Sequence, residues 1–217
     1  MTTLEFYFNT SQSKVVMEIF VLAMLIAIGA YMLKSRAERR RIALLGSHLG
    51  KYQIEKLMES LTGGYMRALA EDDPERREQI WNLLGSSEMK LCDQFNSFVA
   101  EFSGVDALEA RVSKLALPIP YAGNLFPNAT FDLRKLLSIH AHGITNAAKN
   151  SLHRTPKGKA FAMSAELFLM QHSCHWFCKS KTVASARMLV RHQTSYEQVL
   201  ASVAPDTRKA YCTLIGS

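Results

Sequence analysis

The sequence lacks the short motifs that mark the common catalytic sites. It has no Gly-x-Ser-x-Gly, the turn that exposes a nucleophilic serine, and no His-Glu-x-x-His, the helical zinc motif of metalloproteases. Its one Gly-Gly pair, Gly63-Gly64, is not followed by the Lys-Ser or Lys-Thr that cradles phosphates. These absences argue against an α/β-hydrolase, a zinc protease and a P-loop nucleotidase, and we expect a protein that is not an enzyme.

Cysteine is scarce, with four residues in 217. Their spacing matches no zinc-ribbon pattern, so a structural zinc site of that kind is excluded. In a cytoplasmic domain we expect Cys92, Cys174, Cys178 and Cys212 to be reduced thiols.

No segment alternates polar and apolar residues over a strand length with β-branched enrichment, and there is no internal repeat or low-complexity tract. The fold class predicted is therefore all-α: one N-terminal transmembrane helix followed by a cytoplasmic multi-helix domain.

A long apolar run, residues 15–33, is the most informative feature that is present. A helix needs about 20 apolar residues to cross a hydrocarbon core of about 30 Å. The run has one charge, Glu18, which lies close enough to its amino-terminal end to reach interfacial water. Tyr31, near the other end, is typical of an interfacial anchor.

Five cations follow this run directly, whereas residues 1–14 hold one lysine and one glutamate. Positive charge stays on the cytoplasmic side of a membrane, so we expect the amino terminus outside the cell and residues 34–217 in the cytoplasm, at an inner or plasma membrane. The residues expected to contact lipid headgroups are Lys34, Arg36, Arg39, Arg40 and Arg41.

A cleaved signal peptide and a buried core helix are two other interpretations of the run. A cleaved signal peptide has its basic residues before the apolar segment, and here they follow it. A buried core helix is rarely apolar on every face beside a cluster of cations.

Capping residues and helical periodicity predict the element boundaries after the run. The first helix is expected to reach about Leu61 and stop at Gly63-Gly64, with a further unit to Ala70. The later helices are expected over 74–85, 86–104, 106–117 and 128–152, then from 156, from 181 to a turn at 192–194, from 195 to about 200, and over 205–216. The domain organisation predicted is a tail (1–14), a transmembrane helix (15–33), a helical subdomain (34–117), a proline-rich connector (118–127) and a carboxy-terminal helical subdomain (128–217).

The segment 171–178 is the strongest candidate for chemistry. His172, Cys174, His175 and Cys178 lie at helical spacing, and imidazole and thiolate together can hold zinc, copper or haem iron. The same segment is apolar on two sides, which is typical of a central core helix. We therefore expect no cofactor, with a zinc or haem site as the alternative. His140 and His142 point about 200° apart on a helix, so one is expected buried and the other exposed.

The net charge of +7 is unevenly distributed. Residues 71–109 hold ten acids and three bases, and residues 149–191 hold eight bases and one acid. Arg187 and Arg191 belong to the second block, together with a predicted basic interaction patch of Lys157, Lys159, Lys179 and Lys181. A turn at 192–194 between two helices resembles a helix-turn-helix only in outline, so a solvated or membrane-facing basic surface is favoured over a DNA-binding one.

These features predict a membrane-anchored scaffold, adaptor or assembly subunit. Its expected partners are the lipid bilayer and a protein, for which a second copy of the chain qualifies, and not nucleic acid. The alternatives are a membrane-tethered metal or haem sensor built on residues 172–178, and a membrane-associated nucleic-acid-binding protein using the basic carboxy-terminal half.

Overall fold

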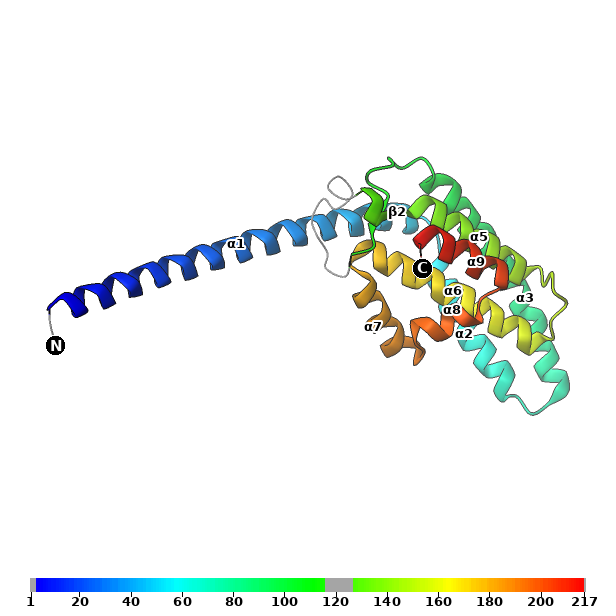
Figure 1. Ribbon diagram of the computed structural model, residues 1–217. Helices are drawn as coiled ribbons and strands as arrows, with labels where there is room; N and C mark the ends of the chain where they lie inside the picture. The colour runs from blue at the N-terminus through cyan, green and yellow to red at the C-terminus, as the bar shows by residue number, and fades with distance from the viewer. Residues whose placement is uncertain (1–2, 116–126, 217) are drawn as a thin grey trace.

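One long helix projects from a compact helical domain in the computed structural model, which describes residues 3–115 and 127–216 (Figure 1). This helix is α1 (Thr3–Leu49); its residues 15–33 are exposed throughout, whereas the helix from Lys34 onward lies against the domain. The domain contains α2 (Ile54–Ala70), α3 (Pro74–Phe102), α5 (Leu133–Ala148), α6 (Pro156–Cys178), α7 (Lys181–His192), α8 (Tyr196–Ser202) and α9 (Pro205–Ile215).

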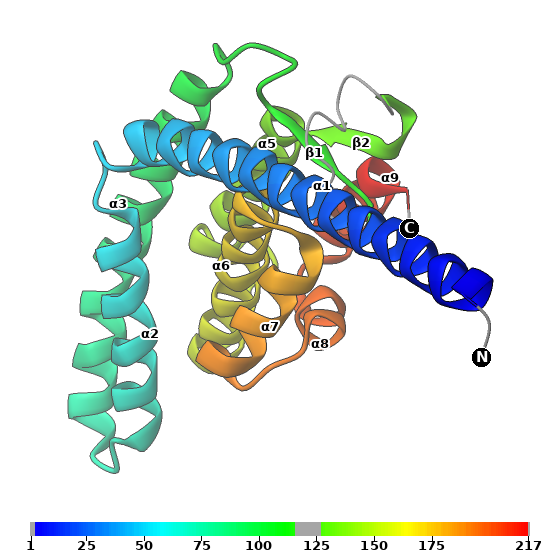
Figure 2. The same ribbon diagram turned by 90° about the vertical axis from the view of Figure 1, so that its left-hand side faces the viewer.

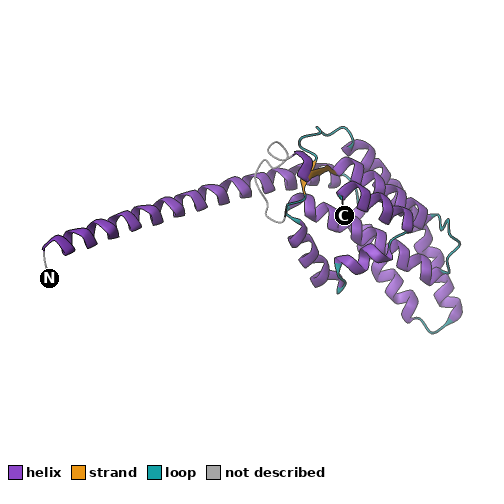
Figure 3. Ribbon diagram, viewed as in Figure 1, coloured by secondary structure: helices purple, strands orange, loops and turns teal. Residues whose placement is uncertain are grey.

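The all-α prediction is confirmed, because 80% of the chain is helical and the described residues form eight helices. The small exception is an antiparallel ribbon of β1 (Arg111–Ser113) and β2 (Thr130–Asp132), preceded by a 3-10 turn, η1 (Pro127–Ala129) (Figure 3). Phe131 on β2 packs edge-on against Trp176 of α6, with ring centroids 5.0 Å apart, and the Trp176 indole donates to the Ser113 carbonyl at 2.9 Å. The ribbon therefore closes one end of α6.

Helix α6 is the centre of the domain, as its two-sided apolar pattern predicts. It packs against α1, α2, α5, α7 and α8, and most of its residues are buried. The core is one continuous cluster that draws on both halves of the chain, from Leu45 on α1 to Ile215 on α9. Figure 2 shows α2 and α3 side by side in a hairpin, and α7 in front of α6.

The boundary predicted at Gly63-Gly64 is wrong. Helix α1 ends at Leu49, and α2 runs through both glycines without a break. A Cβ on Gly64 would collide with the Leu84 side chain, so this glycine lets α2 and α3 approach closely and does not end a helix.

Three further boundaries are wrong. Helix α3 continues through Gly85, because the Ser86 hydroxyl bonds the Leu83 carbonyl within the helix and starts no new one. The helix expected from Asp106 is a capped turn followed by β1. The helix expected from Asn128 begins instead at Leu133, where the Asp132 side chain caps it, and ends at Ala148.

The remaining boundaries hold, with one small shift. Asp73-Pro74 starts α3, Thr155-Pro156 starts α6, and α9 ends at Ile215 with Gly216 as its C-cap. The capping box before α8 pairs Ser195 with Gln198, one residue later than predicted. The proline-rich connector predicted over 118–127 lies, apart from Pro127, outside the described residues.

Candidate functional site

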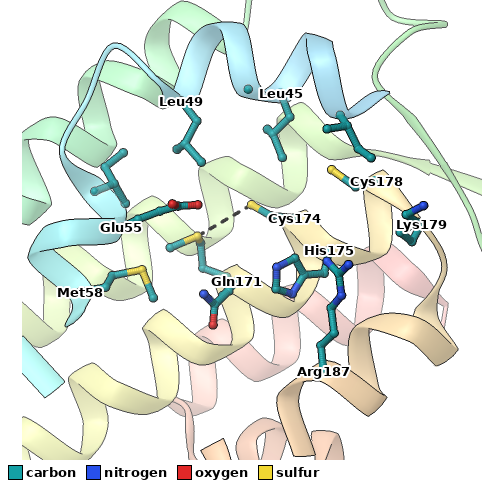
Figure 4. Close-up of a pocket in the computed structure, with 14 residues that line it drawn as sticks. Leu45, Leu49, Glu55, Met58, Gln171, Cys174, His175, Cys178, Lys179 and Arg187 are labelled. Atoms are coloured by element: carbon teal, nitrogen blue, oxygen red, sulfur yellow. Dashed lines mark hydrogen bonds between the residues drawn. The ribbon is translucent and has the colours of Figure 1, made fainter. Parts of the chain in front are cut away.

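A pocket of about 360 Å³ lies where α1 meets the domain (Figure 4). It is enclosed by the end of α1, the start of α2, the end of α6 and one residue of α7. Its lining is Ile42, Leu45, Gly46, Leu49, Ile54, Glu55, Met58, Met170, Gln171, Cys174, His175, Cys178, Lys179 and Arg187. Most of this surface is aliphatic or sulfur-containing, so the pocket, which we call the junction pocket, favours apolar contents.

Three members of the predicted His/Cys cluster reach the junction pocket, and one does not. Cys174, His175 and Cys178 line it, whereas His172 points into the core, where its ring stacks on Tyr196 with centroids 4.6 Å apart. The Cys174 thiol lies 3.9 Å from the Met170 sulfur, which is the contact drawn in Figure 4. Within residues 3–115 and 127–216, no three His, Cys, Asp or Glu side chains converge as a metal would require.

The two thiols of the junction pocket are poor nucleophiles at neutral pH. Burial raises the pKa of Cys174 to about 12 and that of Cys178 to about 11, so both are protonated. Burial also lowers the pKa of His175. Because the thiolate is the reactive form, the pocket lacks the activated sulfur of a redox or catalytic cysteine.

Two fully buried histidines form part of the core. The Nε2 atom of His140 lies 2.9 Å from the Ser173 hydroxyl, and that of His172 lies 3.0 Å from the Ser185 hydroxyl. Burial lowers the pKa of both imidazoles to about 3, so they are neutral. The His140–Ser173 pair resembles a catalytic dyad in composition, but both residues are at most 1% exposed, and no substrate can reach them. His142, two residues away, is exposed, as predicted.

The five juxtamembrane cations divide into two groups. Arg36, Arg39 and Arg40 are exposed. Lys34 instead forms an ion pair with Glu38 at 3.9 Å, and the Arg41 guanidinium lies over the Phe177 ring at 5.9 Å. Burial lowers the pKa of Arg41. Arg41 therefore joins α1 to the domain, whereas the Lys34–Glu38 pair lies within α1.

The four lysines of the predicted basic patch lie at opposite ends of α6. Lys157 and Lys159 are in its first turn, and Lys179 and Lys181 follow its last, so about 30 Å of helix separates the pairs. Lys159 is bound to the buried Glu88 carboxylate, and Lys179 is bound to Glu38. Lys181 lies over the Tyr196 ring at 4.6 Å. The structure does not assemble these lysines into one patch.

A second concave surface lies between α2 and α6, on the part of the domain away from the projecting helix. This groove, of about 610 Å³, is lined by Thr62, Tyr65, Met66, Leu69, Thr155, Lys157, Gly158, Ala160, Phe161, Ser164, Phe168 and His192. Phe161 and Met66 are 65% and 69% exposed, which is unusual for side chains of this size. This α2–α6 groove could not be predicted from the sequence, because nothing in the spacing of Phe161 indicates that its side of α6 lacks a neighbour.

The chain matches no known protein-family model, and no curated protein or solved structure is significantly similar to it. The function of the chain is therefore inferred from its sequence and geometry.

Proposed function

We propose that this protein is a single-pass, membrane-anchored helical adaptor that holds a protein partner at the cytoplasmic face of the membrane. The observation that carries the proposal is the continuity of α1. A single helix forms both an apolar segment without neighbours and one wall of the domain core.

The exposed segment has the properties of a membrane span. Within the described residues, α1 is the one helix long and apolar enough to cross a bilayer, and none of that apolar window is buried. Ile26 and Phe20 are 64% and 69% exposed, on a rod whose apolar residues face every direction. Exposing such a surface to water is costly at roughly 25 cal/mol per Å², which supports a lipid environment and disfavours the buried core helix.

The charge distribution supports one orientation. Arg36, Arg39 and Arg40 are exposed just beyond the apolar segment, and residues 1–14 carry no comparable cluster. By the positive-inside rule, the domain lies in the cytoplasm of a cell with an inner or plasma membrane.

The attachment of α1 to the domain makes the anchor a rigid one. Leu45 is buried in the core, the His48 ring packs edge-on against Phe102 at 5.4 Å, and Lys179 donates to Glu38 at 2.5 Å. The helix continues from the apolar segment through these contacts without a glycine or proline hinge between Lys34 and Leu45. The position of the membrane therefore determines the position of the domain.

The α2–α6 groove supplies the partner surface. Its basic lining residues are Lys157 and His192, and the described residues that line it include no carboxylate. An amphipathic helix with acidic flanks fits these features, because its apolar face would cover Phe161, Met66 and Leu69 while its acids met Lys157.

The anchor is tested by flotation of the full chain with vesicles and by its resistance to carbonate extraction. Retention in the soluble fraction without detergent would refute the anchor. Cysteine labelling from each side of the membrane tests the orientation.

The partner surface is tested by capture in mild detergent followed by cross-linking. We expect a protein that cross-links to α2 or α6 and is lost with Phe161→Glu, but is retained with Leu83→Glu. Leu83, which is 72% exposed on α3, is the matched control. Equal capture by both variants would exclude the groove.

A further inference from the structure

Helix α7 exposes an apolar stripe bordered by cations. Val183, Ala186 and Val190 lie on one face at spacings of three and four residues, and Leu189 lies beside them. Val190 is 78% exposed and Leu189 is 55% exposed. The core contacts of α7 are made from the opposite side, by Ala184 and Met188. This stripe, the α7 face, is therefore not needed to hold the domain together.

The charges on α7 are all positive. The helix contains Lys181, Arg187 and Arg191 and no acid. The last two are exposed, one turn apart along the edge of the α7 face, and neither guanidinium has an ion-pair partner within the part of the chain that the structure describes. An apolar stripe with a basic border is the pattern of a helix that lies in a membrane interface.

The position of α7 matches this pattern. Figures 1 and 2 both show α7 on the side of the domain from which α1 projects. The distance of the start of α7 from the proposed membrane is set by Lys179, which lies two residues before α7 and bonds Glu38 on α1. Glu38 is five residues beyond Leu33, where the apolar run ends, which is about 8 Å along the helix axis. The polar headgroup layer extends roughly 5–8 Å beyond the hydrocarbon core, so the start of α7 falls at its outer boundary.

We propose that α7 is a second membrane contact, which binds anionic phospholipid headgroups through Arg187 and Arg191 and inserts Val183 and Val190 among them. This inference rests on the proposed anchor, because the rod sets the depth of α7. Transmembrane helices are commonly tilted by about 20°, and a tilt of α1 toward α7 would bring more of α7 to the bilayer surface.

The test uses the full chain, with p-benzoylphenylalanine in place of Val190, in vesicles of phosphatidylcholine with or without 30% phosphatidylserine. The reference position is Gln79, which is exposed on the distal α2–α3 hairpin. After irradiation, we expect a lipid adduct at position 190 that is several-fold more abundant with phosphatidylserine, and none at position 79.

Reversal of the charges on α7 tests whether its arginines bind anionic lipid or α7 only lies near the bilayer. Arg187→Glu with Arg191→Glu is expected to abolish the gain from phosphatidylserine, whereas Arg76→Glu with Lys90→Glu, the same change on exposed residues of α3, leaves it intact. Circular dichroism of each variant confirms that it folds.

The outcomes distinguish this inference from the proposed function. A chain that does not float with the vesicles refutes the anchor. A chain that floats without an adduct at position 190 overturns the α7 contact alone. A cross-link to a second copy of the chain, or equal adducts with and without phosphatidylserine, also overturns it.

Discussion

The Lys179 ammonium lies 2.5 Å from a carboxylate oxygen of Glu38, a residue 141 positions earlier in the chain. Glu38 is on the part of α1 that has just left the apolar segment, and Lys179 caps the end of the central helix α6. Side chains of both residues are largely shielded, at 15% and 31% exposed. This ion pair links α1 to the end of the central core helix.

Removal of the Glu38 charge is expected to loosen that link. We expect Glu38→Gln to lower the free energy of unfolding by about 1 kcal/mol, because a partly buried ammonium then loses its counter-ion. A double-mutant cycle with Lys179→Met, read from urea unfolding in mild detergent, should give a coupling free energy of similar size. Additive effects of the two substitutions would show that the pair contributes nothing.

Gly143 on α5 is expected to tolerate no side chain. A Cβ there would lie 2.6 Å from the Thr207 hydroxyl and collide with the buried Glu166 carboxylate. Gly143→Ala should therefore destabilise the domain by roughly 1–3 kcal/mol through overpacking, although alanine is the better helix former. Gly85→Ala is the matched control, because nothing lies within 4 Å of its Cβ position, and it should stabilise by up to about 1 kcal/mol. Equal unfolding midpoints for the two variants would contradict this packing.

Stability is expected to fall in acid because of the two buried imidazoles. Their pKa is lowered from 6.5 to about 3 in the folded chain, so the unfolded chain binds more protons between those values. Stability should be constant with respect to these groups above pH 6.5 and decline by about 1.4 kcal/mol per pH unit for each imidazole as the pH falls toward 3. His140→Gln should reduce this slope by one such contribution, as measured by urea unfolding between pH 4 and 7. An unchanged slope would mean that His140 is charged in the folded state or already neutral in the unfolded one.

Membrane orientation is expected to depend on the three exposed arginines after the apolar segment. Arg36→Glu, Arg39→Glu and Arg40→Glu together should invert or block insertion, because they remove the positive-inside bias. Arg41 is left unchanged here, since it packs over Phe177 and its loss would disturb the fold. The readout is labelling of Cys212 in intact and permeabilised cells, and unchanged labelling would refute the orientation.

The fold class and most helix starts could be predicted, because they depend on local chemistry. The caps at Asp73, Thr155 and Ser195 satisfy backbone amides within three residues, so the sequence carries that information directly. The apolar residues on two sides of α6 likewise predicted that this helix lies at the centre of the domain.

The errors arose where a distant contact decides the structure. In the sequence, Gly64 indicates the end of a helix. In the structure it lies within α2, where the Leu84 side chain packs against it. The ribbon strands are three residues long and have one buried residue each, Val112 and Phe131, so no alternating pattern can develop. Their pairing depends on residues nearly twenty positions apart.

The candidate site was only partly predictable for the same reason. Helical spacing placed Cys174, His175 and Cys178 near one another, but it could not show that Leu45 and Leu49 of α1 would close the pocket over them. Nor could it show that His172 would be turned inward onto Tyr196. The exposure of Phe161 and Val190 could not be predicted from the sequence, because it depends on whether another element packs against each side chain.

A helix without a hinge acts as a lever. If α1 spans a bilayer as we propose, a thinner bilayer would make the helix tilt further to bury its apolar length, and the whole domain would turn with it. The end of the domain that carries Phe161 and Met66 would move furthest. Membrane thickness would therefore determine the distance and the angle between the lipid surface and a bound partner helix.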